Sequence, residues 1–175
     1  TIKPMLKGTS MPGLPDWLFE EGSLTRRLVA RCGQRFSLRL VSSSRGPALP
    51  DERRALALPL ECAALVRQVY LLCGDRPLVF ARSVMPPGSL RGPNGRLARL
   101  GSRPLAVLLF GPVPAARGAI EVAPVGPGQA LFEAAGRGLE CAPAAPLWAR
   151  RSIFYPRGKP VLVTEVFLPG VAELP

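Results

Sequence analysis

The chain has 175 residues, a formal net charge of +11 at pH 7, an apolar content of 47% and a mean hydropathy of +0.20. This length suffices for one domain with a substantial core, and the apolar content is too high for a disordered chain. No apolar run reaches the roughly 18–20 residues of a membrane-spanning helix, so we expect no stable membrane insertion.

The strong basic charge is typical of proteins that bind nucleic acids or acidic surfaces. The arginines are scattered, however, and aromatic residues make up only 6% of the chain. A platform on which bases could stack is therefore not supported. We expect no nucleic-acid partner.

The cysteine pattern and the absence of histidine limit the possible chemistry. The four cysteines form no CxxC pair, and the chain contains no histidine. This excludes the common zinc sites and the Ser-His-Asp and Cys-His mechanisms. We expect a reduced, cytoplasmic protein that uses no metal or organic cofactor.

The first third of the chain is predicted to contain helices followed by a strand. Residues 16–32 have a helical pattern, with Asp16 as the first cap and Gly22-Ser23 as a break that caps a second helix over 24–31. The alternating residues 36–41 predict a strand, and residues 42–50 predict a Ser/Gly/Pro loop.

Hairpins dominate the remainder. Two apolar runs are joined by a turn signal at residues 73–77, and two more are joined at residues 156–160. Between the hairpins, the pattern predicts a loop over 86–95, a helix over 102–110 and a short strand over 119–122. Since no βαβ rhythm appears, the sequence predicts a single α+β domain over residues 1–175, with a mostly antiparallel sheet and a few helices.

Residues 123–146 differ from the rest in composition. They are rich in Ala, Gly and Pro and contain one short helical pattern, over 129–135. The segment is predicted to be a flexible insertion.

Three charged residues lie inside the most apolar predicted strands. They are Arg67, Arg82 and Glu165. Because a strand has a period of two, each shares a face with apolar neighbours. An unpaired buried charge is costly, so two guanidinium groups and one carboxylate indicate a closed pocket for a small anionic molecule. The alternatives are a structural ion-pair network or solvent-facing positions on edge strands.

Several stretches occur together in a fixed order. They are Asp16-Trp17-Leu18, Ser23-Leu24-Thr25-Arg26-Arg27, Arg67 through Cys73, Ala81-Arg82-Ser83-Val84-Met85-Pro86, Leu100-Gly101 with Pro104-Leu105, Leu109-Phe110, Ile120-Glu121-Val122, Leu147 through Ser152, and Gly158-Lys159-Pro160 through Pro169. In this order and at this spacing, the chain resembles the bacterial chorismate pyruvate-lyases. The resemblance leaves out the N-terminal segment, residues 42–60 and residues 123–146.

The resemblance implies an internal ligand cavity under flaps, on an antiparallel sheet. It implies that Arg67 and Arg82 bind the substrate and that Glu165 is the pocket carboxylate. It also implies that Leu24 and Leu105 are apolar pocket positions, although the family often has Met where this chain has Leu24. We add Phe167, which shares the face of Glu165, as a further residue that contacts the substrate ring.

The resemblance implies that the chain eliminates pyruvate from chorismate to give 4-hydroxybenzoate, the first committed step of ubiquinone biosynthesis, without a cofactor. Arg67 and Glu165 are then the catalytic candidates, with Glu165 acting as a base, an acid or a positioning group. A closed pocket for a planar acid also predicts product retention and product inhibition.

The sequence is also compatible with two other functions. The chain also resembles the effector-binding domains of some bacterial transcription regulators, which would make it a non-catalytic module for an aromatic acid. Such a domain usually follows a helix-turn-helix domain, and the residues before Asp16 are too few to form one. The other alternative is a basic protein whose binding to nucleic acid depends strongly on salt.

Overall fold

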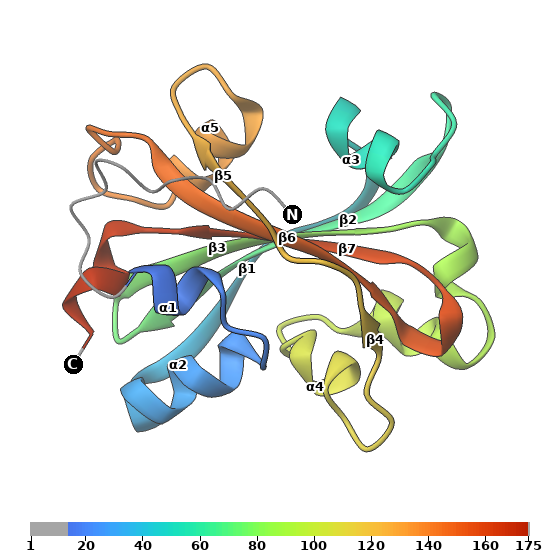
Figure 1. Ribbon diagram of the computed structural model, residues 1–175, viewed down its shortest axis with the longest axis horizontal. Helices are drawn as coiled ribbons and strands as arrows, with labels where there is room; N and C mark the ends of the chain where they lie inside the picture. Colours follow the sequence, from blue (N-terminus) through green and yellow to red (C-terminus); the bar gives the residue numbers. More distant parts are fainter. Residues whose placement is uncertain (1–13, 175) are drawn as a thin grey trace.

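Two long hairpins form the centre of a seven-stranded antiparallel sheet in the computed structural model, which describes residues 14–174 (Figure 1). The strand order is β1-β2-β3-β7-β6-β4, and β5 also pairs with β6. The strands are β1 Phe36–Pro47, β2 Ala63–Cys73, β3 Arg76–Met85, β4 Ala116–Arg117, β5 Glu121–Val125, β6 Leu147–Tyr155 and β7 Val161–Phe167. The predicted α+β class and antiparallel sheet are confirmed. Residues 1–13 and 175 of the predicted domain lie outside the described residues.

Short helices cover both faces of the sheet. They are α1 Leu14–Leu18, α2 Leu24–Cys32, α3 Pro50–Ala55, α4 Ala106–Leu109 and α5 Ala130–Gly136, with 3-10 turns η1 Gly33–Arg35, η2 Pro87–Leu90, η3 Gly92–Arg99, η4 Pro156–Gly158 and η5 Pro169–Glu173. Figure 1 shows α1, α2 and α4 on one face and α3 and α5 on the other.

The core follows from strand periodicity, because alternate residues of the central strands pack on opposite faces. On the α2 face, Val69 and Phe167 pack against Leu24 and Leu28. The opposite face contributes a separate cluster, in which Phe80 packs with residues of α5. Both faces of β2 and β3 are therefore buried, which explains their nearly continuous apolar sequences.

Three local predictions need correction. Residues 42–47 are not a loop: β1 continues to Pro47 and pairs with β2 throughout, past a register shift between Leu40 and Ser42. Proline is tolerated there because β1 is an edge strand, where a missing donor costs no ladder bond.

The helix predictions have mixed outcomes. The helix over 102–110 is reduced to α4, and Asp16 lies inside α1 rather than at its cap. The predicted cap at Ser23 is confirmed, because its hydroxyl accepts a hydrogen bond from the Arg26 backbone amide.

The prediction of reduced cysteines is wrong for one pair. Cys32, at the end of α2, and Cys73, at the end of β2, form a disulfide with their Cα atoms 5.6 Å apart. They are separated by 41 residues in sequence, so only the packing of α2 on the sheet brings them together. Cys62 and Cys141 are free thiols.

The Ala/Gly/Pro-rich segment contains regular structure. Its predicted short helix is confirmed as α5, and its first residues belong to β5. The Tyr70 hydroxyl holds the end of α5: it lies 3.1 and 2.9 Å from the carbonyl oxygens of Ala134 and Ala135, and it accepts a hydrogen bond from Gly138 N at 2.8 Å. Burial raises the pKa of Tyr70. Flexibility of this segment stays a prediction.

We expect Tyr70→Phe to lower the free energy of unfolding by about 1–3 kcal/mol, because buried backbone groups lose their hydroxyl partner. Urea denaturation would measure the loss. Tyr155→Phe is the matched control, since Tyr155 is 39% exposed and should change stability by less than about 0.5 kcal/mol. Equal stability of the two variants would show that Tyr70 does not hold α5.

Candidate functional site

A small cavity of about 50 Å³ lies between the sheet and the segments that cover it. The cover consists of residues 22–25, which form the start of α2 and the turn before it, and the α4 segment, residues 104–110. The sheet contributes polar and apolar residues from six strands. These are Leu38 of β1, Arg67, Val69 and Leu71 of β2, Ala81 and Ser83 of β3, Val163 and Glu165 of β7, Arg150 and Phe154 of β6, and Arg117 of β4.

Strand register places the charged residues together. Ala81 is the partner of Glu165, and Glu165 is the partner of Arg150 in the next strand. Arg67 lies in the adjacent row, opposite Ser83. All of these side chains belong to one face because partners in a sheet share a face.

Arg67 is a buried cation without a counter-ion. It is only 2% exposed, and its Nη2 donates to the carbonyl oxygens of Gly101 and Arg103, both at 2.9 Å. Its Nε is buried and has no hydrogen-bond partner. Within residues 14–174, no carboxylate forms an ion pair with it. Burial lowers the pKa of Arg67. A buried guanidinium that lacks a counter-ion favours the binding of an anionic ligand, which would balance its charge.

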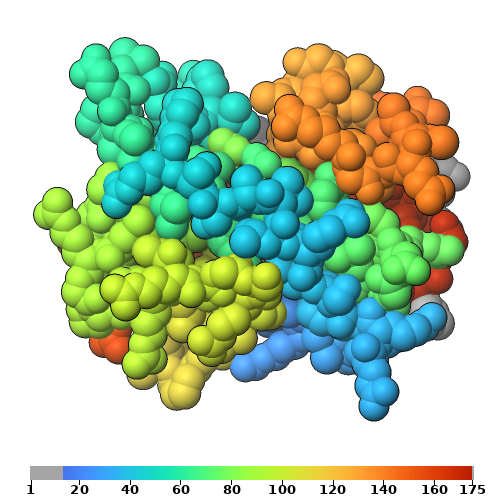
Figure 2. Space-filling view, turned by 180° about the vertical axis from the view of Figure 1, so that it is seen from behind, coloured from blue at the N-terminus to red at the C-terminus, as the bar shows by residue number. Residues whose placement is uncertain are grey.

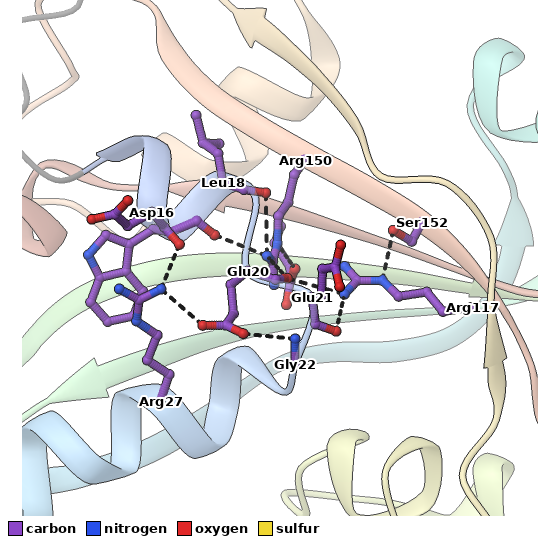
Figure 3. Close-up of polar contacts among 11 residues, drawn as sticks. Asp16, Leu18, Glu20, Glu21, Gly22, Arg27, Arg117, Arg150 and Ser152 are labelled. Carbon is purple, nitrogen blue, oxygen red and sulfur yellow. Dashed lines mark hydrogen bonds and ion pairs between the residues drawn. The ribbon is translucent and has the colours of Figure 1, made fainter. Parts of the chain in front are cut away.

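Arg150 and Glu165 form an ion pair beside Arg67. Arg150 Nε donates to Glu165 Oε2 at 2.6 Å, and Arg150 itself is 2% exposed. Its Nη1 donates to the carbonyl oxygens of Trp17 and Glu20, at 3.0 and 2.8 Å. Figure 3 shows Arg150 reaching from the sheet into the connection between α1 and α2. This guanidinium therefore fixes both the carboxylate and the cover.

Arg117 of β4 is a third cation at the cavity. It donates to Ser152 Oγ at 3.1 Å and to the carbonyl oxygens of Glu20 and Glu21 at 3.2 and 2.9 Å (Figure 3). Burial, and to a smaller degree the charge of Arg150, lowers the pKa of Arg117. Its hydrogen-bond acceptors are neutral, so its charge is also available to an anion.

Four of the six predicted site residues line the cavity: Arg67, Glu165, Leu24 and Leu105. Phe167 lies on the same face, but it packs in the core beside the cavity and does not line it. The centre of its ring lies 5.8 Å from the guanidinium carbon of Arg150, so Phe167 packs against a residue that lines the cavity.

The structure does not bring Arg82 to this cavity. Arg82 points to the opposite face and pairs with Glu52 of α3, with Nε 2.7 Å from Oε1 and Nη2 3.1 Å from Oε2. The expectation that Arg82 lines the same pocket as Arg67 is therefore corrected: Arg82 forms an ion pair with Glu52 instead. Both partners are nearly fully buried.

Sequence reasoning missed Arg117 and Arg150. Arg150 could have been recognised from the sequence, because it lies in a predicted strand and shares a face with Trp148 and Ser152. Arg117 follows Ala115-Ala116 in a short strand that has no recognisable pattern.

A larger hollow of about 1050 Å³ lies between α3 and β5 to α5. The arginines that line it are Arg150, paired with Glu165, and Arg151, which pairs with Asp51 at 2.8 Å and also with Glu121. Both arginines of the larger hollow therefore already pair with carboxylates. The larger hollow is a less favourable site for an anion than the smaller cavity.

Within residues 14–174, no three or more His, Cys, Asp or Glu side chains are grouped so that they could hold a metal ion. None of the helices in this range is long and apolar enough to cross a membrane.

The buried ion pair of Arg82 and Glu52 leads to a testable prediction about the free energy of unfolding. Arg82→Met should cost about 3–5 kcal/mol, because it leaves the Glu52 carboxylate buried and unpaired. The double variant Arg82→Met/Glu52→Gln should recover most of this loss, since Gln keeps the hydrogen bond to Leu49 N that Glu52 now accepts. Urea denaturation of the three proteins would measure both values. A double variant no more stable than Arg82→Met would contradict the ion-pair explanation.

Comparisons with known proteins show which family the chain belongs to. Residues 7–173 match the model of the chorismate lyase family. A probable chorismate pyruvate-lyase of Methylococcus capsulatus is 41% identical over 170 residues, covering 93% of this chain and 98% of that protein. Another, of an Azoarcus species, is 43% identical over 165 residues, covering 93% and 87%.

Solved structures show the same fold at low identity. A ligand-binding domain assigned to a GntR-family transcriptional regulator of Bordetella bronchiseptica matches with a TM-score of 0.54 and 21% identity, covering 77% of this chain and 84% of that one. A GntR-family regulator of Bacillus cereus matches with a TM-score of 0.57 and 10% identity, covering 78% and 94%. The fold is therefore shared with effector-binding domains, whereas the sequence match over nearly its full length shows that the chain belongs to the chorismate lyase family.

Proposed function

We propose that the protein is a carbon–oxygen lyase that eliminates pyruvate from chorismate and leaves 4-hydroxybenzoate, the aromatic acid from which ubiquinone is built. The observation that carries the proposal is Arg67, a buried guanidinium in the cavity that has no counter-ion, and no partner for its Nε, among residues 14–174. Membership of the family supplies the identity of the anion.

The charge of the cavity matches that of the substrate. Arg67, Arg117 and Arg150 contribute three positive charges and Glu165 one negative charge, a balance of +2. Chorismate carries two carboxylates, so its binding would neutralise the site. Guanidinium groups suit this role because they stay charged when buried and bind carboxylates through two parallel hydrogen bonds.

Each carboxylate is assigned to one arginine. Arg67 binds the first through its free Nε. Since Arg82 lies on the other face, we assign the second carboxylate to Arg117, whose present acceptors are neutral oxygens. Arg150 remains paired with Glu165 and keeps that carboxylate oriented toward the cavity.

The cavity must enlarge to admit chorismate. Its volume of about 50 Å³ is well below the roughly 300–1000 Å³ of typical ligand sites. The sheet is fixed by its ladders, so the segments that move are the covers that carry Leu24 and Leu105. On closing, these two side chains press on the ring and exclude water. The same closure retains the planar product, which favours slow release and product inhibition.

The reaction breaks the bond between the ring and the enolpyruvyl oxygen. The ring carbon that bears the hydroxyl loses its proton, the electron pair of that C–H bond completes the aromatic ring, and the enolpyruvyl group gains a proton to become pyruvate. Glu165 accepts a hydrogen bond from the ring hydroxyl and fixes the conformer in which these bonds align. The arginines stabilise the departing oxygen. Aromatisation provides the driving force, so no cofactor is needed.

Arg67→Met tests the assignment. We expect kcat/KM for the formation of 4-hydroxybenzoate and pyruvate to fall about 100-fold or more, because a positioned charge is lost. The free energy of unfolding should stay the same or rise, since an unpaired buried charge is removed. Arg45→Met, at an exposed position of β1, is the matched control and should change neither value.

Normal kcat/KM in Arg67→Met would exclude Arg67 from the site. A folded wild-type protein that forms neither product but binds 4-hydroxybenzoate would instead be a binding module with the same fold.

A further inference from the structure

Four exposed arginines form a patch at one end of the molecule. This arginine patch consists of Arg96 and Arg99 of η3, Arg103, and Arg157 in the turn between β6 and β7. Two adjoining hollows, of about 410 and 420 Å³, share Arg96 and Arg99; the first adds Arg103 and the second Arg157. Figure 2 shows the yellow-green segment that contains η3 forming one end of the molecule.

The patch carries no balancing negative charge. Neither hollow is lined by an acidic residue, and none of the four arginines takes part in an ion pair within residues 14–174. The sequence contains no Asp or Glu between Asp75 and Glu121. Among the other exposed arginines, Arg76 pairs with Glu173. The patch therefore lies in a part of the chain that has no acidic residue close in sequence.

Apolar side chains lie among these charges. Val107, Leu108 and Pro112 line the same hollow as Arg96, Arg99 and Arg103. Val107 is 53% exposed, and Val113, at the adjacent turn, is 73% exposed. Among the residues that the structure describes, no aromatic side chain lines either hollow, so the patch offers no platform on which bases could stack. Cations interleaved with exposed aliphatic side chains suit the headgroup region of an anionic bilayer.

The patch is also the outer side of the cavity cover. The carbonyl oxygen of Arg103 accepts a hydrogen bond from Arg67, and the neighbouring Leu105 lines the cavity. The side chains of Arg103 and Val107 point to solvent from the same short segment. A surface that engages this patch would therefore contact the segment that must move to admit or release a ligand.

We propose that the arginine patch docks the protein on an anionic lipid bilayer. The guanidinium groups contact lipid phosphates, and Val107 and Val113 enter the headgroup region. Docking needs no chorismate, so it is tested independently of the proposed lyase activity.

The experiment measures binding of the full chain to phosphatidylcholine vesicles with and without phosphatidylglycerol, at low and high salt. We expect binding only to vesicles that contain phosphatidylglycerol, and weakening with salt. Each arginine near an anionic surface contributes about fivefold in affinity, so Arg96→Gln/Arg99→Gln/Arg157→Gln should bind roughly 100-fold more weakly. These three residues lie outside the cavity, so the variant should keep its turnover of chorismate.

The matched control is Arg35→Gln/Arg45→Gln/Arg54→Gln, which removes the same charge from exposed positions outside the patch. We expect its affinity to fall much less than that of the patch variant. Equal losses would mean that net charge alone causes binding and would overturn the proposal. So would a failure to bind anionic vesicles, or tighter binding to duplex DNA than to vesicles. A wild-type protein without lyase activity that binds as described would refute the proposed function and leave the docking surface intact.

Discussion

The site depends on one carboxylate, Glu165, which pairs with only one of the three guanidinium groups at the cavity. Glu165 neutralises Arg150, and Arg150 uses its remaining donors to hold the carbonyl oxygens between α1 and α2. Within the described part of the chain, this leaves Arg67 and Arg117 with neutral acceptors only. Such an arrangement is costly without a ligand, because desolvated charges remain unbalanced. The sheet can tolerate it since its ladders and two apolar faces supply stability elsewhere.

Periodicity in the sequence was enough to find Arg67 and Glu165 but not to place Arg82. If the register of Cys73 with Arg76 and Leu72 with Pro77 continued, Arg67 would lie directly opposite Arg82. Instead, the register shifts between Leu71 and Leu72, and Arg67 lies opposite Ser83. One inserted residue reverses the face of every side chain beyond it. A bulge of this kind has no reliable signal in a single sequence.

The hairpins were predictable because their turn residues are local, whereas the features missed depend on distant packing. Glu52 becomes the partner of Arg82 only when α3 folds over the sheet, and the local sequence does not show where α3 packs. Arg117 reaches the cavity from a two-residue strand. Cys32 meets Cys73 through the seating of α2. In each case the contact is fixed by tertiary structure, and no local propensity in the sequence predicts it.

The disulfide at the far end of α2 restricts how the cavity can open. Cys32 ties the last residue of the helix to the sheet, while Leu24, its first residue, faces the cavity. The helix therefore cannot lift away as a whole; it can only swing about its tethered end. With about 12 Å between the two ends, a rotation of roughly 20° would move Leu24 by roughly 4 Å. The covalent bond thus serves as a pivot, and the entrance widens most at the point farthest from it.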